Sequence, residues 1–236
     1  MRLELLKNHA IKGNLAYLPS RWDDRNSRGN GTYKIMDRYK WGLSFQSNRS
    51  RKLSHEISAS YEEEHIEGNS RGLEYEIKWQ PIPNFSTEVS LGYKKRTGWL
   101  LHEAERNLTT FDANAWEPEL EVVYVPSPKQ QFRISAQWVG IKALENNRWK
   151  APIIAGELIA DTDSETEKRD FTISKLIFQA RYRWEIAPLS DLFVVYTRGS
   201  DLPSQPERHF RDLLTDTWSR RKTDSLIIKL RYRLGN

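Results

Sequence analysis

The stretch from 171 to 198 constrains the fold of this chain more than any other. Its even positions from Leu176 to Ile186 are apolar or aromatic, while the odd positions are mostly charged or amide-bearing. Because successive side chains on a β-strand point to opposite faces, this alternation indicates a strand with one apolar and one polar face. The segment 187–191 interrupts the pattern with Pro188, and the alternation resumes from Leu192 to Thr197. The stretch is therefore predicted to be an antiparallel hairpin.

The same period of two recurs along the rest of the chain. A second clear hairpin has strands near 73–80 and 85–94, joined by a turn that contains two prolines. A third pairs 119–124 with 132–138, and the chain ends on alternating residues from Leu226 to Leu234. About eleven segments qualify as strands of the ~9–11 residues that a tilted membrane strand needs. The predicted fold class is therefore all-β.

Short and long connections alternate between these predicted strands. Tight turns at one end and long loops at the other are typical of outer-membrane β-barrels. We therefore predict that residues 1–236 form an antiparallel up-and-down transmembrane β-barrel domain, a partial barrel of about ten to twelve strands. The first strands, Arg2 to Leu6 and Ile11 to Leu18, are the least regular, and 20–32 is predicted to be a polar loop. The predicted short connections are 48–52, 81–84, 126–130 and 187–191, and the long ones are 64–71, 97–115, 144–169 and 199–224.

Charged residues repeat on the polar face of several predicted strands. A water-filled lumen accommodates such residues, and opposite charges on neighbouring strands can pair across it. The residues expected to face the lumen, as structural or pore-lining groups, are Glu74, Glu76, Glu119, Glu121, Arg133, Arg181, Arg183, Lys229, Arg231 and Arg233. The apolar residues expected to point outwards to lipid are Phe178, Tyr182, Leu230 and Tyr232. Trp79 and Trp184 precede short turns, as an interfacial aromatic girdle would, while Trp138 lies further from a turn.

The composition of the chain excludes some classes of protein. Apolar residues make up 38% of the chain, mean hydropathy is −0.75, and no run of ~18 apolar residues exists, which excludes transmembrane helices. The net charge of +5 is spread along a chain with 32 acidic residues, so nucleic acid is not expected as a partner. The absence of cysteine fits an oxidising compartment. The first residues lack a secretory signal, so the chain is either cytosolic or the C-terminal part of something longer.

No catalytic, cofactor or metal site is predicted. The chain has no Gly-rich phosphate loop, HExxH or CxxC motif, and its histidines are dispersed. Ser190 and Asp191 are interpreted as turn residues. The acidic run Asp161 to Glu167 is interpreted as a solvated loop in preference to a divalent-cation site that bridges lipopolysaccharide. Two alternative functions stay open: a barrel-embedded hydrolase with catalytic groups at its outer rim, and a soluble β-sandwich binding module.

Several short motifs resemble an uncharacterised bacterial family. They are Arg183-Trp184-Glu185, followed by Pro188, Ser190 and the strand Leu192 to Val195. This family pattern has Gly in the turn, where the present chain has Leu189. The end of the chain, Ile228 to Leu234, resembles the closing strand of the family. A loop motif also matches, Trp22-Asp23-Asp24-Arg25 with Arg28-Gly29.

The resemblance implies a C-terminal outer-membrane β-barrel that follows a carbohydrate-binding family 9-like domain, which this chain lacks. It further implies outer-membrane lipid, lipopolysaccharide and the barrel assembly machinery as partners, and a role in transport or in binding surface glycans. Recognition by that machinery depends on the final strand. Tyr232 and Leu234 are therefore the closing-strand residues that the resemblance singles out, although the last residue of the chain is not aromatic.

Overall fold

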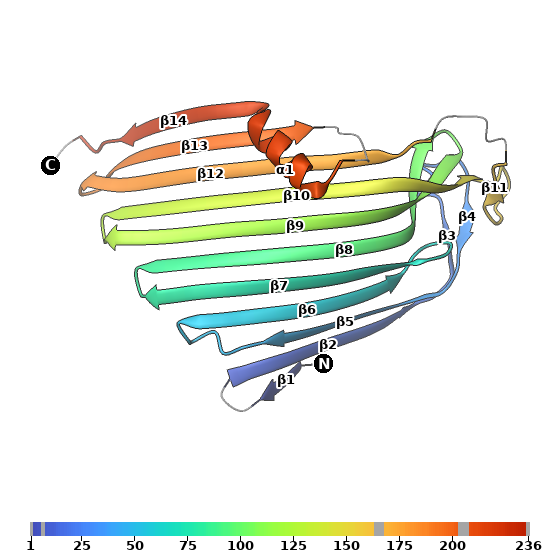
Figure 1. Cartoon of the computed structure of the whole chain (residues 1–236), viewed down its shortest axis with the longest axis horizontal. Helices are drawn as coiled ribbons and strands as arrows, with labels where there is room; N and C mark the ends of the chain where they lie inside the picture. The colour runs from blue at the N-terminus through green and yellow to red at the C-terminus, as the bar shows by residue number, and fades with distance from the viewer. Residues whose placement is uncertain (1, 6–7, 163–167, 203–207, 235–236) are drawn as a thin grey trace.

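The computed structural model describes residues 2–5, 8–162, 168–202 and 208–234. Among these residues, 11 strands follow one another as an antiparallel meander (Figure 1). The prediction of an all-β antiparallel meander is therefore confirmed. In sheet order the strands are β1 (Arg2–Leu5), β2 (His9–Leu18), β5 (Arg38–Gln46), β6 (Leu53–Glu63), β7 (Asn69–Ile82), β8 (Phe85–Ala104), β9 (Asn107–Ser127), β10 (Gln130–Lys150), β12 (Phe171–Ala187), β13 (Ser190–Leu202) and β14 (Thr223–Arg231).

Three short strands and a helix lie outside this order in the part of the chain that the structure describes. β3 (Arg21–Asp23) and β4 (Tyr33–Ile35) form a separate two-stranded sheet, and β11 (Ile159–Ala160) pairs with β10. The helix α1 (Phe210–Ser219) connects β13 to β14. Within the described residues, no helix has the length and apolar character needed to cross a membrane.

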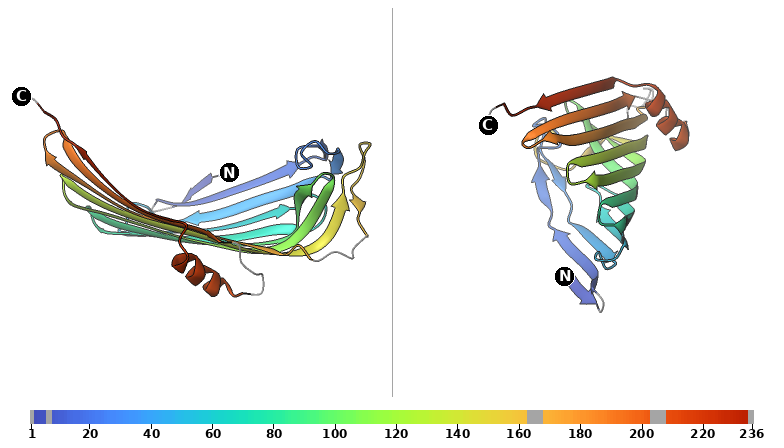
Figure 2. Two further views of the ribbon diagram at one scale, coloured as in Figure 1. Left: turned by 90° about the horizontal axis from the view of Figure 1, so that it is seen from above. Right: turned by 90° about the vertical axis from the view of Figure 1, so that its left-hand side faces the viewer.

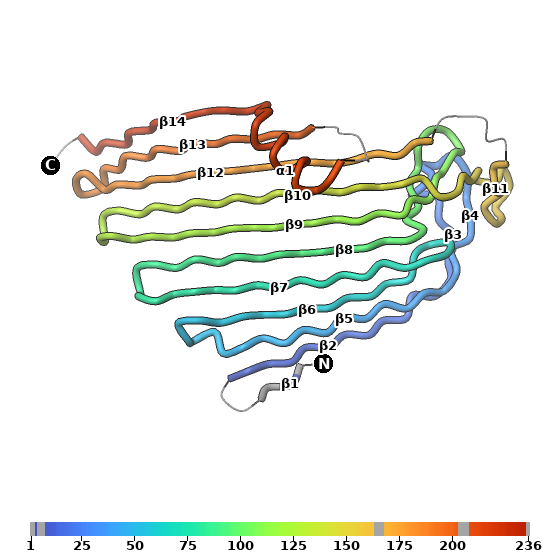
Figure 3. The backbone as a smooth tube through the Cα atoms, in the orientation of Figure 1, coloured from blue at the N-terminus to red at the C-terminus, as the bar shows by residue number. Residues whose placement is uncertain are grey.

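The large sheet is curved and open. Figure 2 shows it as a trough, with α1 outside the curve on the convex side. The backbone trace in Figure 3 follows one up-and-down path from β1 at one edge to β14 at the other. In the described residues, β1 pairs with β2 alone and β14 pairs with β13 alone. The sheet thus has the shape of a partial barrel wall.

Contacts of α1 identify the residues of the convex face. Leu213 of the helix packs with Trp138 of β10 and Leu176 of β12. Trp218 makes an edge-on ring contact with Phe178, also in β12. Because side chains alternate between faces, the even-numbered residues of β12 lie on the convex face and the odd-numbered ones on the concave face. The cross-strand register carries this assignment to the other strands, which makes the convex face largely apolar and the concave face largely polar.

The two ends of the sheet differ in their connections. At the short-connection end, on the left of Figure 1, brief turns join β5 to β6, β7 to β8, β9 to β10 and β12 to β13, as the sequence predicted. The opposite end, called here the long-connection end, carries the β3–β4 hairpin and β11, and the β13–β14 connection with α1 leaves from the same ends of its strands. The predicted long connection at 97–115 is wrong, because β8 continues to Ala104 and β9 begins at Asn107. Strict alternation of connection length therefore fails between these two strands.

A β-bulge explains why the sequence around Thr97 resembles a loop. The register between β8 and β9 shifts at this point, and Gly98 has a φ of 71°. A Cβ on Gly98 would lie 1.9 Å from the carbonyl oxygen of Glu67, and one on Gly68 would lie 2.2 Å from that of Thr97. Only glycine tolerates backbones this close together. Gly98 therefore bends a continuous strand and does not end it.

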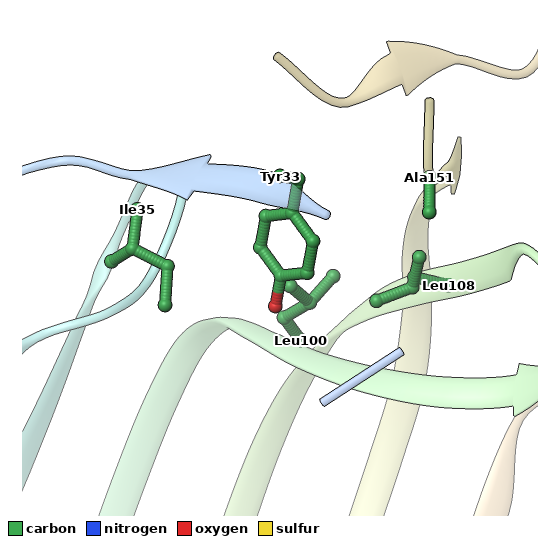
Figure 4. Close-up of a cluster of buried hydrophobic side chains, with 5 residues drawn as sticks. All are labelled: Tyr33, Ile35, Leu100, Leu108 and Ala151. Carbon is green, nitrogen blue, oxygen red and sulfur yellow. The ribbon is translucent and has the colours of Figure 1, made fainter. Parts of the chain in front are cut away.

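A hydrophobic cluster anchors the β3–β4 hairpin at the long-connection end. Tyr33 and Ile35 of β4 pack on Leu100 and Leu108 from the β8–β9 pair and on Ala151 after β10 (Figure 4). The polar loop predicted at 20–32 thus contains β3 and leads into a strand with two buried side chains. The hairpin therefore covers the ends of strands that are distant from it in the sheet order.

Two more buried clusters lie along the sheet. Phe111, Ala113 and Ala143 form one of them on β9 and β10. The other lies under α1, within the segment 199–224 that the sequence predicted as a long connection. The closing strand also differs from its predicted bounds of 226–234. It covers Thr223–Arg231, so Tyr232 and Leu234 follow the strand and are exposed.

Candidate functional site

The concave face gathers most of the charged residues that the sequence singled out. All of the predicted lumen-facing residues except Arg233 lie in strands and share this face by register. For example, Ser90 pairs with Glu76 on one side and with Glu119 on the other. Arg233 follows β14, and its backbone N–H donates to the Ser190 hydroxyl at 3.0 Å. The structure therefore gives these residues a common surface, whose role is considered below.

Glutamates concentrate in the middle of the concave face, on β6 to β9. Three of them occupy every second position of β9, because the local sequence places a glutamate on the polar side of each pleat. Sequence reasoning had not singled out Glu56, Glu88 or Glu117, although the alternation that marks Glu74 applies equally to Glu56 and Glu88. The acidic patch consists of Glu56, Glu74, Glu76, Glu88, Glu117, Glu119 and Glu121.

Cations concentrate beside the acidic patch, on β10 to β14. The basic patch consists of Arg133, Arg181, Arg183, Lys229 and Arg231. The two patches meet where Arg133 Nη2 lies 2.7 Å from Glu121 Oε2, across the β9–β10 pair. The concave face thus presents two regions of opposite charge next to each other.

Both patches contain like charges in directly opposed positions. Glu56 faces Glu76 across β6 and β7, Glu88 faces Glu121 across β8 and β9, and Arg133 faces Arg181 across β10 and β12. Such pairs destabilise a sheet, by up to roughly 1 kcal/mol each. Arg49 relieves one of them, since its Nη2 lies 3.0 Å from the Glu56 carboxylate.

Asp191 ties the basic patch to the short-connection end. It is 1% exposed and accepts hydrogen bonds from Arg183, with Nε at 3.0 Å and Nη2 at 2.9 Å. Arg231 of β14 also donates to this carboxylate. The interpretation of Ser190 and Asp191 as turn residues is therefore wrong: they begin β13, and Pro188 and Leu189 make the turn. One buried carboxylate links three strands and orients two of the arginines.

Several shallow depressions lie on the patches. One in the acidic patch measures about 180 Å³ and is lined by Glu74, Glu117 and Glu119 together with small residues of neighbouring strands. One in the basic patch measures about 370 Å³ and is lined by three arginines and the apolar side chains of Phe193 and Val195. Both depressions are open; the acidic one has a mainly polar lining, whereas apolar side chains contribute most of the surface of the basic one.

The convex face contrasts with this surface because it exposes large apolar side chains on almost every strand. Trp79 and Trp184 lie on it near the short-connection end and are partly exposed, whereas Trp138 is buried beneath α1. Exposed members from the meander strands include Leu15, Tyr17, Tyr39, Trp41, Leu43, Ile57, Leu73, Tyr75, Val89, Leu91, Leu120, Tyr124, Phe132, Ile134, Leu226, Ile228 and Leu230.

Ionisable groups at the long-connection end are buried to different degrees. Burial raises the pKa of Tyr33 to about 12, and its hydroxyl donates to Asp23 at 3.3 Å. Burial also raises the pKa of Glu64. Arg96 opposes this shift, because its Nε lies 3.3 Å from Oε1 of Glu64. The pKa of His65 is lowered, mainly by burial. These groups belong to the connections and are not part of either patch.

Other residues considered from the sequence do not come together. In the described ranges, no group of three or more His, Asp or Glu residues is arranged to hold a metal ion. The acidic run 161–167 lies mostly outside the described residues; its first member, Asp161, forms an ion pair with Lys150 at 3.0 Å. The histidines are His9, His55, His65, His102 and His209.

Comparison with known proteins gives one match. The model of a family described as a domain of unknown function (DUF5916) matches residues 1–235. The chain belongs to the DUF5916 family. No curated protein and no solved structure matches it. The DUF5916 assignment agrees with the resemblance to an uncharacterised family. The carbohydrate-binding-like domain and the outer-membrane context that the resemblance implies are not part of this match.

Proposed function

We propose that this DUF5916 chain forms the wall of an outer-membrane β-barrel whose concave face lines a water-filled passage. The observation that carries the proposal is the exposed apolar surface that extends over the convex face from β2 to β14. Soluble monomers rarely expose contiguous apolar patches of more than a few hundred Å². A lipid bilayer removes such a surface from water, and the hydrophobic effect then stabilises the inserted state.

The single-sheet architecture favours lipid over a protein partner on the convex face. A soluble β-sandwich needs a second sheet packed on the apolar face. Among the described residues, the only other sheet is the β3–β4 hairpin, which packs at the long-connection end. The sandwich alternative therefore has no second layer to support it.

The concave face supports transport of polar solutes. Charged side chains lining a passage select by charge, as rings of acidic or basic residues do in channels. The acidic and basic patches lie side by side, so a solute with both charges finds partners for each. No specific contact among the described residues favours the hydrolase alternative or a glycan-binding role.

Membrane insertion is the first test. The full-length protein that carries this domain, expressed in a Gram-negative host, is expected in the outer-membrane fraction with heat-modifiable gel mobility, whereas residues 1–236 alone, with two unpaired edge strands, are expected to insert poorly. A monodisperse, detergent-free soluble protein would overturn the proposal. The passage is tested separately by conductance in planar bilayers. Glu119→Lys is expected to shift ion selectivity towards anions and Arg181→Glu towards cations. Unchanged selectivity in both variants would show that the acidic and basic patches do not line the passage.

A further inference from the structure

The helix α1 occupies a place where a barrel wall would otherwise meet lipid. It lies outside the curve of the sheet, on the convex face (Figure 2). Its buried side chains, Leu213 and Thr217, pack towards β10 and β12. Thr217 and Ser174 of β12 share a hydrogen bond, and the Trp138 indole donates to the same Ser174 hydroxyl at 3.0 Å. These contacts fix the helix to the outer wall.

The position of α1 along the strands corresponds to the edge of a membrane. In β12 the convex residues from Trp184 to Phe178 lie between the short turn and the helix, and Leu176 lies under it. Eight residues separate Trp184 from Leu176, or ~26 Å at ~3.3 Å per residue. A strand tilted by ~40° then rises ~20 Å, close to the ~25 Å apolar band of such barrels. The helix therefore lies where that band ends.

The side chains of α1 have the distribution of an interfacial helix. Trp218 is 46% exposed, and its ring contacts Phe178, which lies on the side of the helix that faces the short turns. The guanidinium carbon of Arg198 lies 4.9 Å from the centroid of the Trp218 ring. Leu214, four residues earlier, is exposed on the same flank. Aromatic rings with a polar partner concentrate at membrane–water interfaces. This flank therefore continues the apolar convex face up to its rim.

Several cations lie on α1 and directly before and after it. Arg208 pairs with Asp216, and Arg221 pairs with Asp224 at 3.0 Å. Among the described residues, no hydrogen bond or ion pair involves the side chains of Arg211, Arg220 or Lys222, all of which are exposed. These cations are therefore available to a ligand with negative charge.

We propose that α1 binds the phosphate groups of anionic lipid headgroups at the rim of the barrel through Arg211, Arg220 and Lys222. The inference rests on the proposed membrane insertion and adds a lipid site to it. Arginine and lysine donate charge-assisted hydrogen bonds to phosphate, and Trp218 and Leu214 contact the acyl boundary below. The helix thereby sets the depth of the wall in the bilayer.

The test uses the full-length protein reconstituted in phosphatidylcholine vesicles with trace spin-labelled lipids. The motionally restricted fraction of labelled phosphatidylglycerol is compared with that of labelled phosphatidylcholine. Wild-type protein is expected to prefer phosphatidylglycerol by at least about fivefold, because even one cation near an anionic surface contributes roughly that factor in affinity. The triple variant R211Q/R220Q/K222Q is expected to reduce this ratio to near one, with an unchanged β-sheet circular dichroism spectrum.

A charge-matched control removes three cations from the concave face. K12Q/K40Q/K94Q loses the same net charge, and these side chains lie on the face that is turned away from lipid. The control is expected to keep the preference. Insertion without any preference, or a preference that survives the helix variant, would overturn the lipid site alone. Failure of the wild-type full-length protein to insert would instead overturn the proposed function on which the site rests.

Discussion

The two ends of the sheet place their apolar side chains in different environments. At the long-connection end, Tyr33 and Leu108 are fully buried in protein. At the short-connection end, Trp79, Trp184 and Leu230 are 46%, 39% and 60% exposed. Burial of one large apolar side chain stabilises a fold by about 1.5–3 kcal/mol. The long-connection end has this contribution from its own chain, whereas the short-connection end lacks it and, in our account, obtains it from lipid.

This difference concerns where the apolar side chains of each region are covered by the chain itself. Two of the buried clusters lie towards the long connections and the third lies under α1 near the middle of the sheet, so that β4, α1 and the ends of β8 to β10 supply the packing. The other half depends on backbone pairing, on the Asp191 network and on its surroundings. We therefore expect core mutations at the long-connection end to lower the free energy of unfolding, and charge mutations on the convex face to impair membrane insertion.

The largest expected effect is loss of the core at the long-connection end. Leu108→Ala is expected to lower the free energy of unfolding by about 2–5 kcal/mol, because the side chain is 0% exposed and leaves a cavity. Urea unfolding in detergent micelles measures this. The matched control Leu144→Ala, at a half-exposed position in β10, is expected to change stability by less than about 0.5 kcal/mol. Equal effects at the two positions would show that the cluster is not a core.

The second effect concerns the convex face nearer the short turns. Tyr182→Arg is expected to impair insertion into phosphatidylcholine vesicles, since an arginine on the lipid face costs about 2–4 kcal/mol at mid-membrane. The ring of Tyr182 also stacks on Phe132, with centroids 4.4 Å apart. Gln179→Arg places the same charge on the concave face and is expected to insert normally. Heat-modifiable gel mobility measures the insertion of both variants. Normal insertion of Tyr182→Arg would contradict the proposal that the convex face contacts lipid.

The third effect is a stabilisation at the β12–β13 turn. Leu189 has a φ of 61°, a left-handed conformation that costs a residue with a Cβ about 1–2 kcal/mol. Leu189→Gly is expected to raise the free energy of unfolding by up to about 1 kcal/mol, because glycine adopts this φ without a clash. Leu189→Ala keeps the Cβ and is expected to gain little. If alanine stabilised the protein as much as glycine, backbone strain would not be the cause.

The smallest effect is a pH dependence confined to the long-connection end. Burial and the neighbouring Arg38 lower the pKa of His65 below its ordinary value of 6.5. The folded state therefore favours the neutral ring, so this contribution to stability is fully present above pH 6.5 and is lost as the pH falls towards the folded-state pKa. Amide exchange of the β6–β7 connection, corrected for intrinsic rates, should show less protection at pH 5.5 than at pH 7.5. His65→Gln should abolish the difference, and an unchanged difference would assign it to another group.

Sequence reasoning succeeds where structure is local and periodic. The alternation in β7, β9 and β12 predicts both strands and faces, because the period of two follows from backbone geometry alone. It fails where contacts between residues distant in the sequence determine the local structure or the burial of a side chain. Gly98 forms a bulge only because Glu67 approaches it, and Tyr33 is buried only because Leu108 lies opposite. The helix α1 was missed although Phe210, Leu213 and Leu214 have helical spacing, because the segment 199–224 was interpreted as one long connection between strands.

The same limit applies to the charged face. Glu119, Glu121 and Arg181 could be assigned to one face from alternation. The like-charge pairs, such as Arg133 opposite Arg181, require the register between strands, which turn lengths and bulges determine. Asp191 was misassigned because its partners come from β12 and from β14, and the latter follows 40 residues later.

Cysteine scanning of β12 in vesicles tests the central claim most directly. The chain has no cysteine, so each single-cysteine variant carries one reactive thiol. With the protein in phosphatidylcholine vesicles, a membrane-impermeant maleimide should label cysteines at Gln179, Arg181 and Arg183, which face the aqueous side. Cysteines at Phe178, Ala180 and Tyr182 should be protected by lipid and become reactive in urea. This period-two pattern is the predicted result, and uniform labelling along the strand, or the inverse pattern, would contradict a wall with lipid on its convex face.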